Sequence, residues 1–200
     1  MEQKNEEKNE EKKKSIMSEV LDYVKMIAIV LAVVLIVDGV VLINARIPSG
    51  SMEKTIMTGD RIFGLRLAYG LNIDLLGFEY STKWKDPERY DIVIFHYPDD
   101  ESQLYIKRII GLPGETVEIR QGKVYINGSE KPLEDSFING EPVGDFGPYE
   151  VPEDSYFMLG DNRQNSKDSR YWNNKFVRFD QIVGKALFRY FPTPKLLNNK

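Results

Sequence analysis

A run of twenty residues from Val24 to Ile43 is almost entirely apolar, and it restricts the fold of this chain more than any other segment. At a rise of about 1.5 Å per residue, a helix of this length spans roughly 30 Å, the thickness of the hydrocarbon core of a bilayer. Asp38 is the one carboxylate in the run, and its place toward the end lowers the cost of inserting it. The run predicts a transmembrane helix.

The same run could be the apolar region of a signal peptide that is later removed. It is longer than the roughly 7–15 residues usual for such a region. A cut after Ala45 would also place the bulky Ile43 at the third position before the cut, where small residues are usual. We therefore expect a retained anchor helix over residues 19–45, and the alternative of a buried soluble helix is not favoured.

The charges on either side of the run predict its orientation. Lysines lie before it or at its start, whereas Arg46 is the basic residue that closely follows it. Because positive charge favours the cytoplasmic side, residues 1–18 should form a cytoplasmic tail and residues 46–200 an extracytoplasmic domain at the cell membrane. The first 14 residues are mostly Lys, Glu, Asn and Gln, which predicts disorder.

Composition excludes several kinds of function. The chain has no cysteine and one histidine, which excludes disulfide bonds and metal sites built from thiolates or several imidazoles. The net charge is −4 and no basic patch runs through residues 46–200, so a nucleic-acid partner is not expected. We predict no cofactor.

From residue 59 onward the sequence is typical of β-structure. Runs rich in Val, Ile, Tyr and Phe are separated by Gly and Pro, and they predict strands at 61–67, 91–97, 104–110, 116–120 and 123–127. R-Q-G-K at 120–123 predicts a hairpin turn, N-G at 127–128 predicts a second turn, and residues 128–150 resemble an extended loop. The fold class is therefore mainly β, with curved antiparallel sheets or a barrel-like domain after one transmembrane helix.

A serine directly after the apolar run is the first candidate for chemistry. I-P-S-G-S-M at 47–52 places Ser51 close to the membrane surface, and its hydroxyl needs a base to become a nucleophile. His96 lies inside a predicted strand with no glycine turn near it, which does not favour a Ser-His-Asp triad. Lys54 completes the S-x-x-K pattern of penicillin-recognising acyl enzymes, but the accompanying K-T-G and S-D-N motifs are absent.

Lys107 is a second candidate base. A lysine can accept a proton near neutral pH only if burial lowers its pKa by several units from about 10.4. On a strand over 104–110, Lys107 shares a face with Tyr105, and Arg108 points to the opposite face with Ile106. One of the two basic residues can face solvent while the other faces an apolar layer. The alternative is that Lys107 extends from a sheet edge to water.

A third cluster, G-D-N-R-Q-N-S-K-D-S-R at 160–170, is dense in side chains that bond to backbone or charged groups. It could be a surface turn stabilised by its own side chains. It could instead be a polar network that holds an active site, in which Ser166 directs a neutral lysine and Asp168 pairs with Arg170.

In chain order, these segments resemble the sequence boxes of type I signal peptidases, in the compact form typical of Gram-positive bacteria. The matching segments are I-P-S-G-S-M at 47–52, G-D-R-I at 59–62, Y-I-K-R-I-I-G-L-P-G-E at 105–115 and G-D-N-R-x-x-S-x-D-S-R at 160–170. The resemblance implies a membrane-bound serine endopeptidase that removes signal peptides from exported preproteins, cutting after small residues in an Ala-x-Ala pattern. Its implied partners are signal peptides, the lipid bilayer and the secretion translocon.

The resemblance also implies a role for each matching residue. Ser51 would be the nucleophile and Lys107 the general base, and the Ser51 N–H and the Ser49 hydroxyl would form the oxyanion hole. The supporting polar network would comprise Ser166, Asp161, Arg163, Asp168 and Arg170. Aliphatic side chains, Ile47 and Ile106, would line the pockets for the residues one and three positions before the cut.

One position departs from the family pattern, and other functions remain open. Lys54 stands where the family usually has proline, although Thr55 follows as expected. A non-catalytic β-module that binds export partners and the S-x-x-K acyl enzyme are the alternatives. A self-cleaving repressor peptidase would share the dyad, but it carries a DNA-binding module where this chain has its apolar run.

Overall fold

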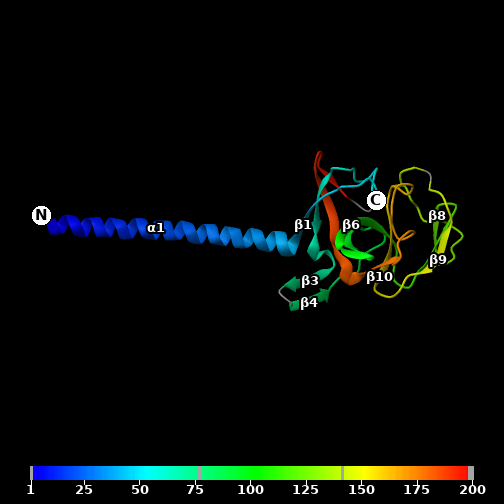
Figure 1. Ribbon diagram of the computed structural model, residues 1–200, viewed down its shortest axis with the longest axis horizontal. Coiled ribbons are helices and arrows are strands. Elements are labelled where there is room, and N and C mark those ends of the chain that lie inside the picture. Colours follow the sequence, from blue (N-terminus) through cyan, green and yellow to red (C-terminus); the bar gives the residue numbers. More distant parts are fainter. Residues whose placement is uncertain (1, 76–77, 141, 198–200) are drawn as a thin grey trace. The chain divides into compact units, whose positions relative to one another are not determined.

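The computed structural model describes residues 2–75, 78–140 and 142–197, and it divides into two units, Met1–Gly39 and Val40–Lys200. The helix α1 of the first unit runs from Glu2 to Ile36 (Figure 1). A π-helical turn over Val37–Val41 follows it and includes the boundary between the two units. The stretch Met17–Val41 is long and apolar enough to cross a membrane, by length and composition.

The helix differs from its predicted bounds at both ends. It includes the charged residues predicted to be disordered, because Lys, Glu and Gln are strong helix formers and can extend a helix that has already begun. It ends before residue 45, since Leu42 begins a strand that pairs with residues 61–65. The predicted division at residues 18 and 45 therefore stays a prediction about the membrane, not a description of the elements.

The second unit is built from antiparallel strands. They are β1 (Leu42–Arg46), β2 (Arg61–Leu65), β3 (Gly70–Leu75), β4 (Phe78–Lys83), β5 (Ile92–Tyr97), β6 (Asp100–Gly111), β7 (Thr116–Arg120), β8 (Lys123–Ile126), β9 (Phe146–Glu150), β10 (Ser155–Leu159), β11 (Phe176–Arg178), β12 (Ile182–Phe191) and β13 (Lys195–Leu196). Short 3-10 turns occupy Arg66–Ala68 and Phe179–Gln181.

The strands form one large sheet and two small ones. The large sheet has the order β1-β2-β12-β5-β6-β10-β11, with β13 beside β12. β3 and β4 form a ribbon, and β8-β7-β9 form a separate small sheet; the β8–β9 region is marked in Figure 1. Within the described residues β1 and β11 do not pair with each other, so the large sheet is not a closed barrel. The prediction of a mainly β, antiparallel domain after one apolar helix is confirmed.

The predicted turn at 120–123 joins β7 to β8 in the expected way. Gln121 and Gly122 have φ values of 49° and 77°, as a type I′ hairpin requires. The segment predicted as a loop over 128–150 contains β9, which lies at the edge of the small sheet and therefore tolerates Pro148.

Both faces of β6 are covered by apolar clusters, and this decides the environment of the site. Ile106 packs in a cluster with Ile47, whereas Ile109 packs in a second cluster with Trp172. Ile110 belongs to a third cluster, which lies against the small sheet. The second half of β6 is consequently buried on both sides, from Ile106 to Gly111.

Candidate active site

Ser51 lies at the start of a turn over residues 51–55, in the connection between β1 and β2. Two buried apolar side chains fix this turn to the core, because Met52 and Ile56 are both fully buried in the first cluster. The Met52 carbonyl accepts hydrogen bonds from the N–H groups of Thr55 and Ile56, at 3.0 and 2.9 Å. The apolar residues four positions apart thus hold the Ser51 backbone in place.

Lys107 on β6 meets Ser51 in a buried setting. Lys107 Nζ lies 2.7 Å from Ser51 Oγ and also donates to the Ile106 carbonyl at 3.0 Å. Lys107 is 3% exposed and Ser51 7% exposed. Burial lowers the pKa of Lys107 to about 8, against the opposing effect of the negative charges on Asp168 and Asp161. At that pKa about a tenth of Lys107 is neutral at pH 7, so it can accept a proton from a hydroxyl.

Arg108 is buried as well, so the expectation that one of the two basic residues faces solvent is wrong. Its guanidinium makes a bidentate pair with Asp161, at 2.8 and 2.6 Å, and donates to the Tyr90 carbonyl at 2.8 Å. A buried cation persists when its charge and its hydrogen bonds are satisfied in this way. Asp161 also accepts a hydrogen bond from Thr55 Oγ1, which links the ion pair to the turn of Ser51.

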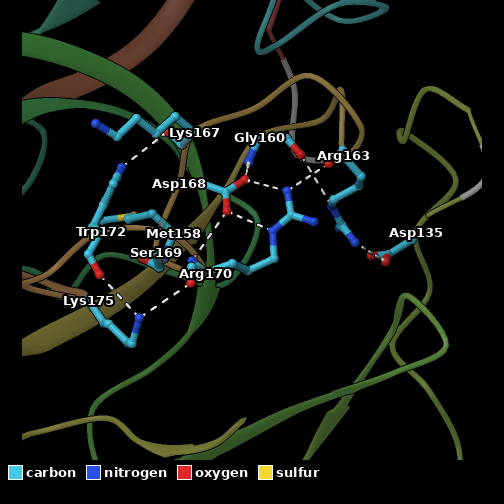
Figure 2. Close-up of polar contacts among 10 residues, drawn as sticks. All are labelled: Asp135, Met158, Gly160, Arg163, Lys167, Asp168, Ser169, Arg170, Trp172 and Lys175. Atoms are coloured by element: carbon cyan, nitrogen blue, oxygen red, sulfur yellow. Dashed lines mark hydrogen bonds and ion pairs between the residues drawn. The ribbon is translucent and has the colours of Figure 1, made fainter. Parts of the chain in front are cut away.

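A second buried ion pair stabilises the 160–170 segment (Figure 2). Arg170 donates to Asp168 from Nε at 2.8 Å and from Nη2 at 2.9 Å. The same Asp168 carboxylate accepts the Gly160 N–H at 3.0 Å, and Arg170 Nη2 donates to the Arg163 carbonyl at 2.8 Å. The predicted pairing of Asp168 with Arg170 is therefore present, and it closes the segment on itself.

Ser166 is 6% exposed, and its hydroxyl has no hydrogen-bond partner within the described part of the chain. It lies at the junction where the 160–170 segment meets the turn of Ser51, and the absence of a side chain at Gly160 lets the two come this close. A Cβ at position 160 would lie 2.2 Å from Ser166 Oγ and 2.5 Å from the Ser51 carbonyl oxygen. Asn162 completes the junction, since its backbone N–H donates to the Ser51 carbonyl at 3.1 Å.

The junction opens into a cleft of about 600 Å³. Its lining comes from residues 48–51, from β6 and from the 164–171 segment: Pro48, Ser49, Ser51, Leu104, Tyr105, Ile106, Lys107, Gln164, Asn165, Ser166, Lys167 and Tyr171. Ser49 is exposed there. Of the two predicted pocket residues, Ile106 lines the cleft, whereas Ile47 is 3% exposed and packs in the cluster that contains Ile106.

The two other candidate bases lie elsewhere. The His96 ring nitrogen Nδ1 is 2.7 Å from the Glu101 carbonyl, and His96 is not among the described residues that line the cleft. Lys54 is exposed and has a φ of 67°. Residues 51–55 form a turn and not the α-helix that an S-x-x-K acyl enzyme places there.

A family model described as signal peptidase, peptidase S26, matches residues 20–191. The chain belongs to this family. It is 41% identical over 155 residues to a probable signal peptidase I-2 of a Synechocystis species, covering 75% of this chain and 63% of the relative, which is less than two thirds of its length. It is 39% identical over 157 residues to the signal peptidase I of Leptolyngbya laminosa, covering 75% of this chain and 69% of that protein.

A solved relative is the crystal structure of a signal peptidase I from Enterococcus faecalis. It is 39% identical and aligns with 50% of this chain and 97% of its own, with a TM-score of 0.44.

In this member of the signal peptidase family, several residues around the site were not predicted from the sequence. Three such residues connect the turn of Ser51 and β6 with the 160–170 segment: Arg108, Asn162 and Gly160. Each lies inside a motif of the family resemblance, which assigned it no role. Asp135, which lies in the segment predicted as a loop, pairs with Arg163 at 2.9 Å. No local pattern could have found Asp135, because its partner lies 28 residues away.

Proposed function

We propose that this chain is a membrane-bound serine endopeptidase that removes N-terminal signal peptides from exported preproteins. The observation that carries the proposal is the 2.7 Å contact between Ser51 Oγ and Lys107 Nζ in a buried setting that lowers the pKa of the lysine. Family membership supports the class of reaction. The apolar helix Met17–Val41 supports attachment to a membrane.

The mechanism follows from a base that is neutral part of the time. Neutral Lys107 takes the proton of Ser51 Oγ, and the oxygen attacks the carbonyl carbon of the scissile peptide bond. As the C–N bond breaks, protonated Lys107 donates its proton to the leaving amine. Neutral Lys107 then takes a proton from water, whose oxygen attacks the acyl carbon. As the bond to Ser51 Oγ breaks, Lys107 returns the proton to Ser51 Oγ, which restores the hydroxyl and the neutral base.

Hydrogen-bond donors must stabilise the negative charge that develops on the carbonyl oxygen in the transition state. We assign this role to the Ser51 N–H and the Ser49 hydroxyl, because Ser49 is exposed at the cleft beside Ser51. One such donor contributes roughly 2.7–4 kcal/mol to transition-state stabilisation in other hydrolases. Ser166 lines the same cleft, and its buried hydroxyl makes no hydrogen bond within the described residues. We propose that this free hydroxyl accepts a hydrogen bond from Lys107 during the reaction and so orients it.

The cleft suits an extended peptide with small side chains near the cut. A substrate strand can lie between β6 and the 164–167 segment, both of which line the cleft, and we propose that it pairs with main chain there. We propose that Ile106, which lines the cleft, and Ile47, which packs in the same cluster, bound small pockets that accept alanine-sized side chains and so give the Ala-x-Ala preference. Asp161, Arg163, Asp168 and Arg170 are proposed as the network that keeps this arrangement rigid.

The proposed location is the cell membrane. The helix would cross once with the N-terminus in the cytoplasm, and the catalytic domain would lie on the extracytoplasmic face, as the distribution of basic residues predicts. The partners would be signal peptides of secreted preproteins, the lipid bilayer and the secretion translocon.

Cleavage of a preprotein by the full chain in detergent tests the proposal. We expect Ser51→Ala and Lys107→Ala each to lower kcat by roughly a thousandfold or more, because nucleophile and base act as a unit. Lys54→Ala is the matched control and should retain wild-type turnover, since Lys54 is exposed on the turn. Full turnover by Lys107→Ala would refute the dyad. Loss of turnover in Lys54→Ala would favour the S-x-x-K enzyme, and no cleavage by the wild type would favour a binding module.

A further inference from the structure

Residues 135–139, called the strap below, lie in the segment between β8 and β9 that was predicted to be a loop. The strap has a defined conformation. Just before it, the Leu133 N–H donates to the Val124 carbonyl of β8 at 2.8 Å, and within it the Ile138 N–H donates to the Asp135 carbonyl at 3.1 Å. Leu133 and Phe137 both pack against the third core cluster. The strap is therefore attached to the small sheet.

The strap covers the buried Arg108 from one side. The Phe137 ring centre lies 4.0 Å from Arg108 Cζ, within the range of a cation–π contact. The ring also meets Tyr90 edge to face at 5.5 Å, and the Tyr90 carbonyl accepts a hydrogen bond from Arg108. Phe137 consequently excludes water from the guanidinium that pairs with Asp161.

Two further contacts join the strap to the segment that contains Asp161. The Asn139 N–H donates to the Asp161 carbonyl at 2.8 Å. Asp135 Oδ2 lies 2.9 Å from Arg163 Nη1, an ion pair visible in Figure 2 whose side chains are 12% and 1% exposed. The strap thus holds residues 161 and 163 by a main-chain bond and a charge pair.

The same segment holds the nucleophile turn. Asp161 accepts a hydrogen bond from Thr55 Oγ1, and the Asn162 N–H donates to the Ser51 carbonyl. A displacement of Asp161 or Asn162 would therefore move Ser51 relative to Lys107. Misplacement of a reacting group by about 1 Å can lower a rate on the order of a hundredfold.

We propose that Phe137 and Asp135 are positioning residues for the reaction at Ser51. Phe137 acts through Arg108, which pairs with Asp161, and Asp135 acts through Arg163, which follows Asn162 in the chain. Neither is among the described residues that line the cleft. This inference rests on the proposed function, because the reaction being positioned is cleavage by the Ser51–Lys107 pair.

The test compares Phe137→Ala with Leu133→Ala in the full chain. Leu133 packs in the same cluster, but its described contacts do not include the polar network, so its truncation controls for lost core packing. Rates on a signal-peptide substrate are divided by the concentration of active sites titrated with a serine-directed acylating probe. We expect Phe137→Ala to lower kcat roughly tenfold with KM within about twofold, and Leu133→Ala to change kcat by less than about twofold.

Two conservative variants complete the test. Phe137→Tyr keeps the ring and should restore kcat to within about twofold of wild type. Asp135→Asn keeps the shape, removes the charge and should lower kcat without a matching rise in KM. Equal values of kcat for Phe137→Ala and Leu133→Ala would overturn the proposal. If the wild type cleaves no signal-peptide substrate, the proposed function fails, and the rate at which the probe acylates Ser51 in the same variants then decides the role of the strap.

Discussion

Replacement of Lys107 by methionine would measure how strongly the fold disfavours the charge on this lysine. Burial lowers the pKa of Lys107 from 10.5 to about 8 in the folded chain. Because the folded pKa is the lower one, the fold penalises the protonated form. The penalty is fully present below about pH 8 and disappears as the pH rises through the unfolded value. The shift corresponds to about 3 kcal/mol of unfolding free energy.

The pH dependence separates this penalty from the other effects of the substitution. Lys107→Met also removes the hydrogen bonds to Ser51 Oγ and to the Ile106 carbonyl, each of which contributes about 1 kcal/mol at any pH. Groups that titrate in both proteins cancel in the difference. Between about pH 7 and pH 9, the wild type should therefore gain roughly 1 kcal/mol of stability relative to the methionine variant.

Urea denaturation of the full chain in detergent gives the required free energies, with the buried Trp172 in the second core cluster as the fluorescent reporter. The two proteins should be compared at several pH values over this interval. If their difference in unfolding free energy does not change with pH, Lys107 Nζ has an ordinary pKa, and the reasoning from burial to a neutral base is refuted.

Two further substitutions test the geometry around Ser51. Gly160→Ala places a Cβ 2.2 Å from Ser166 Oγ and 2.5 Å from the Ser51 carbonyl, so it should lower the unfolding free energy by about 1–3 kcal/mol and also slow cleavage; wild-type behaviour in both assays would contradict the close approach. Lys54 has a φ of 67°, a value that glycine adopts readily and that proline cannot adopt. Lys54→Gly should raise stability by up to about 1 kcal/mol and Lys54→Pro should lower it, as thermal unfolding would show; a stabilising proline would mean that the turn has another conformation.

The parts of the fold predicted from the sequence are those with strong local signals. The β7–β8 hairpin was predicted because two strand-like runs flank R-Q-G-K, and Gly122 suits the positive φ that the turn needs. Strand β12 was not predicted, because Gly184 and Lys185 interrupt its apolar pattern. Its pairing with β2 also shifts register twice, which breaks the alternation that a sequence pattern relies on.

The candidate site shows the same division between local and distant signals. Ser51 and Lys107 lie in motifs with a family resemblance, so they could be proposed as candidates without any knowledge of the fold. The burial of Arg108 was not predicted, because it depends on Asp161, 53 residues away, and on cover for both faces of β6. The contacts of Phe137 and Asp135 likewise arise from a segment with no regular pattern, where only tertiary structure decides which side chains meet.

Covalent labelling by a serine-directed acylating probe tests the central claim most directly. After the full chain is incubated with the probe in detergent, peptide mapping by mass spectrometry locates the modified residue and gives its rate of labelling. We expect one label, on Ser51, which is absent in Ser51→Ala and forms roughly a thousandfold or more slowly in Lys107→Ala. A label on another residue, or labelling of Ser51 at the wild-type rate in Lys107→Ala, would contradict this claim.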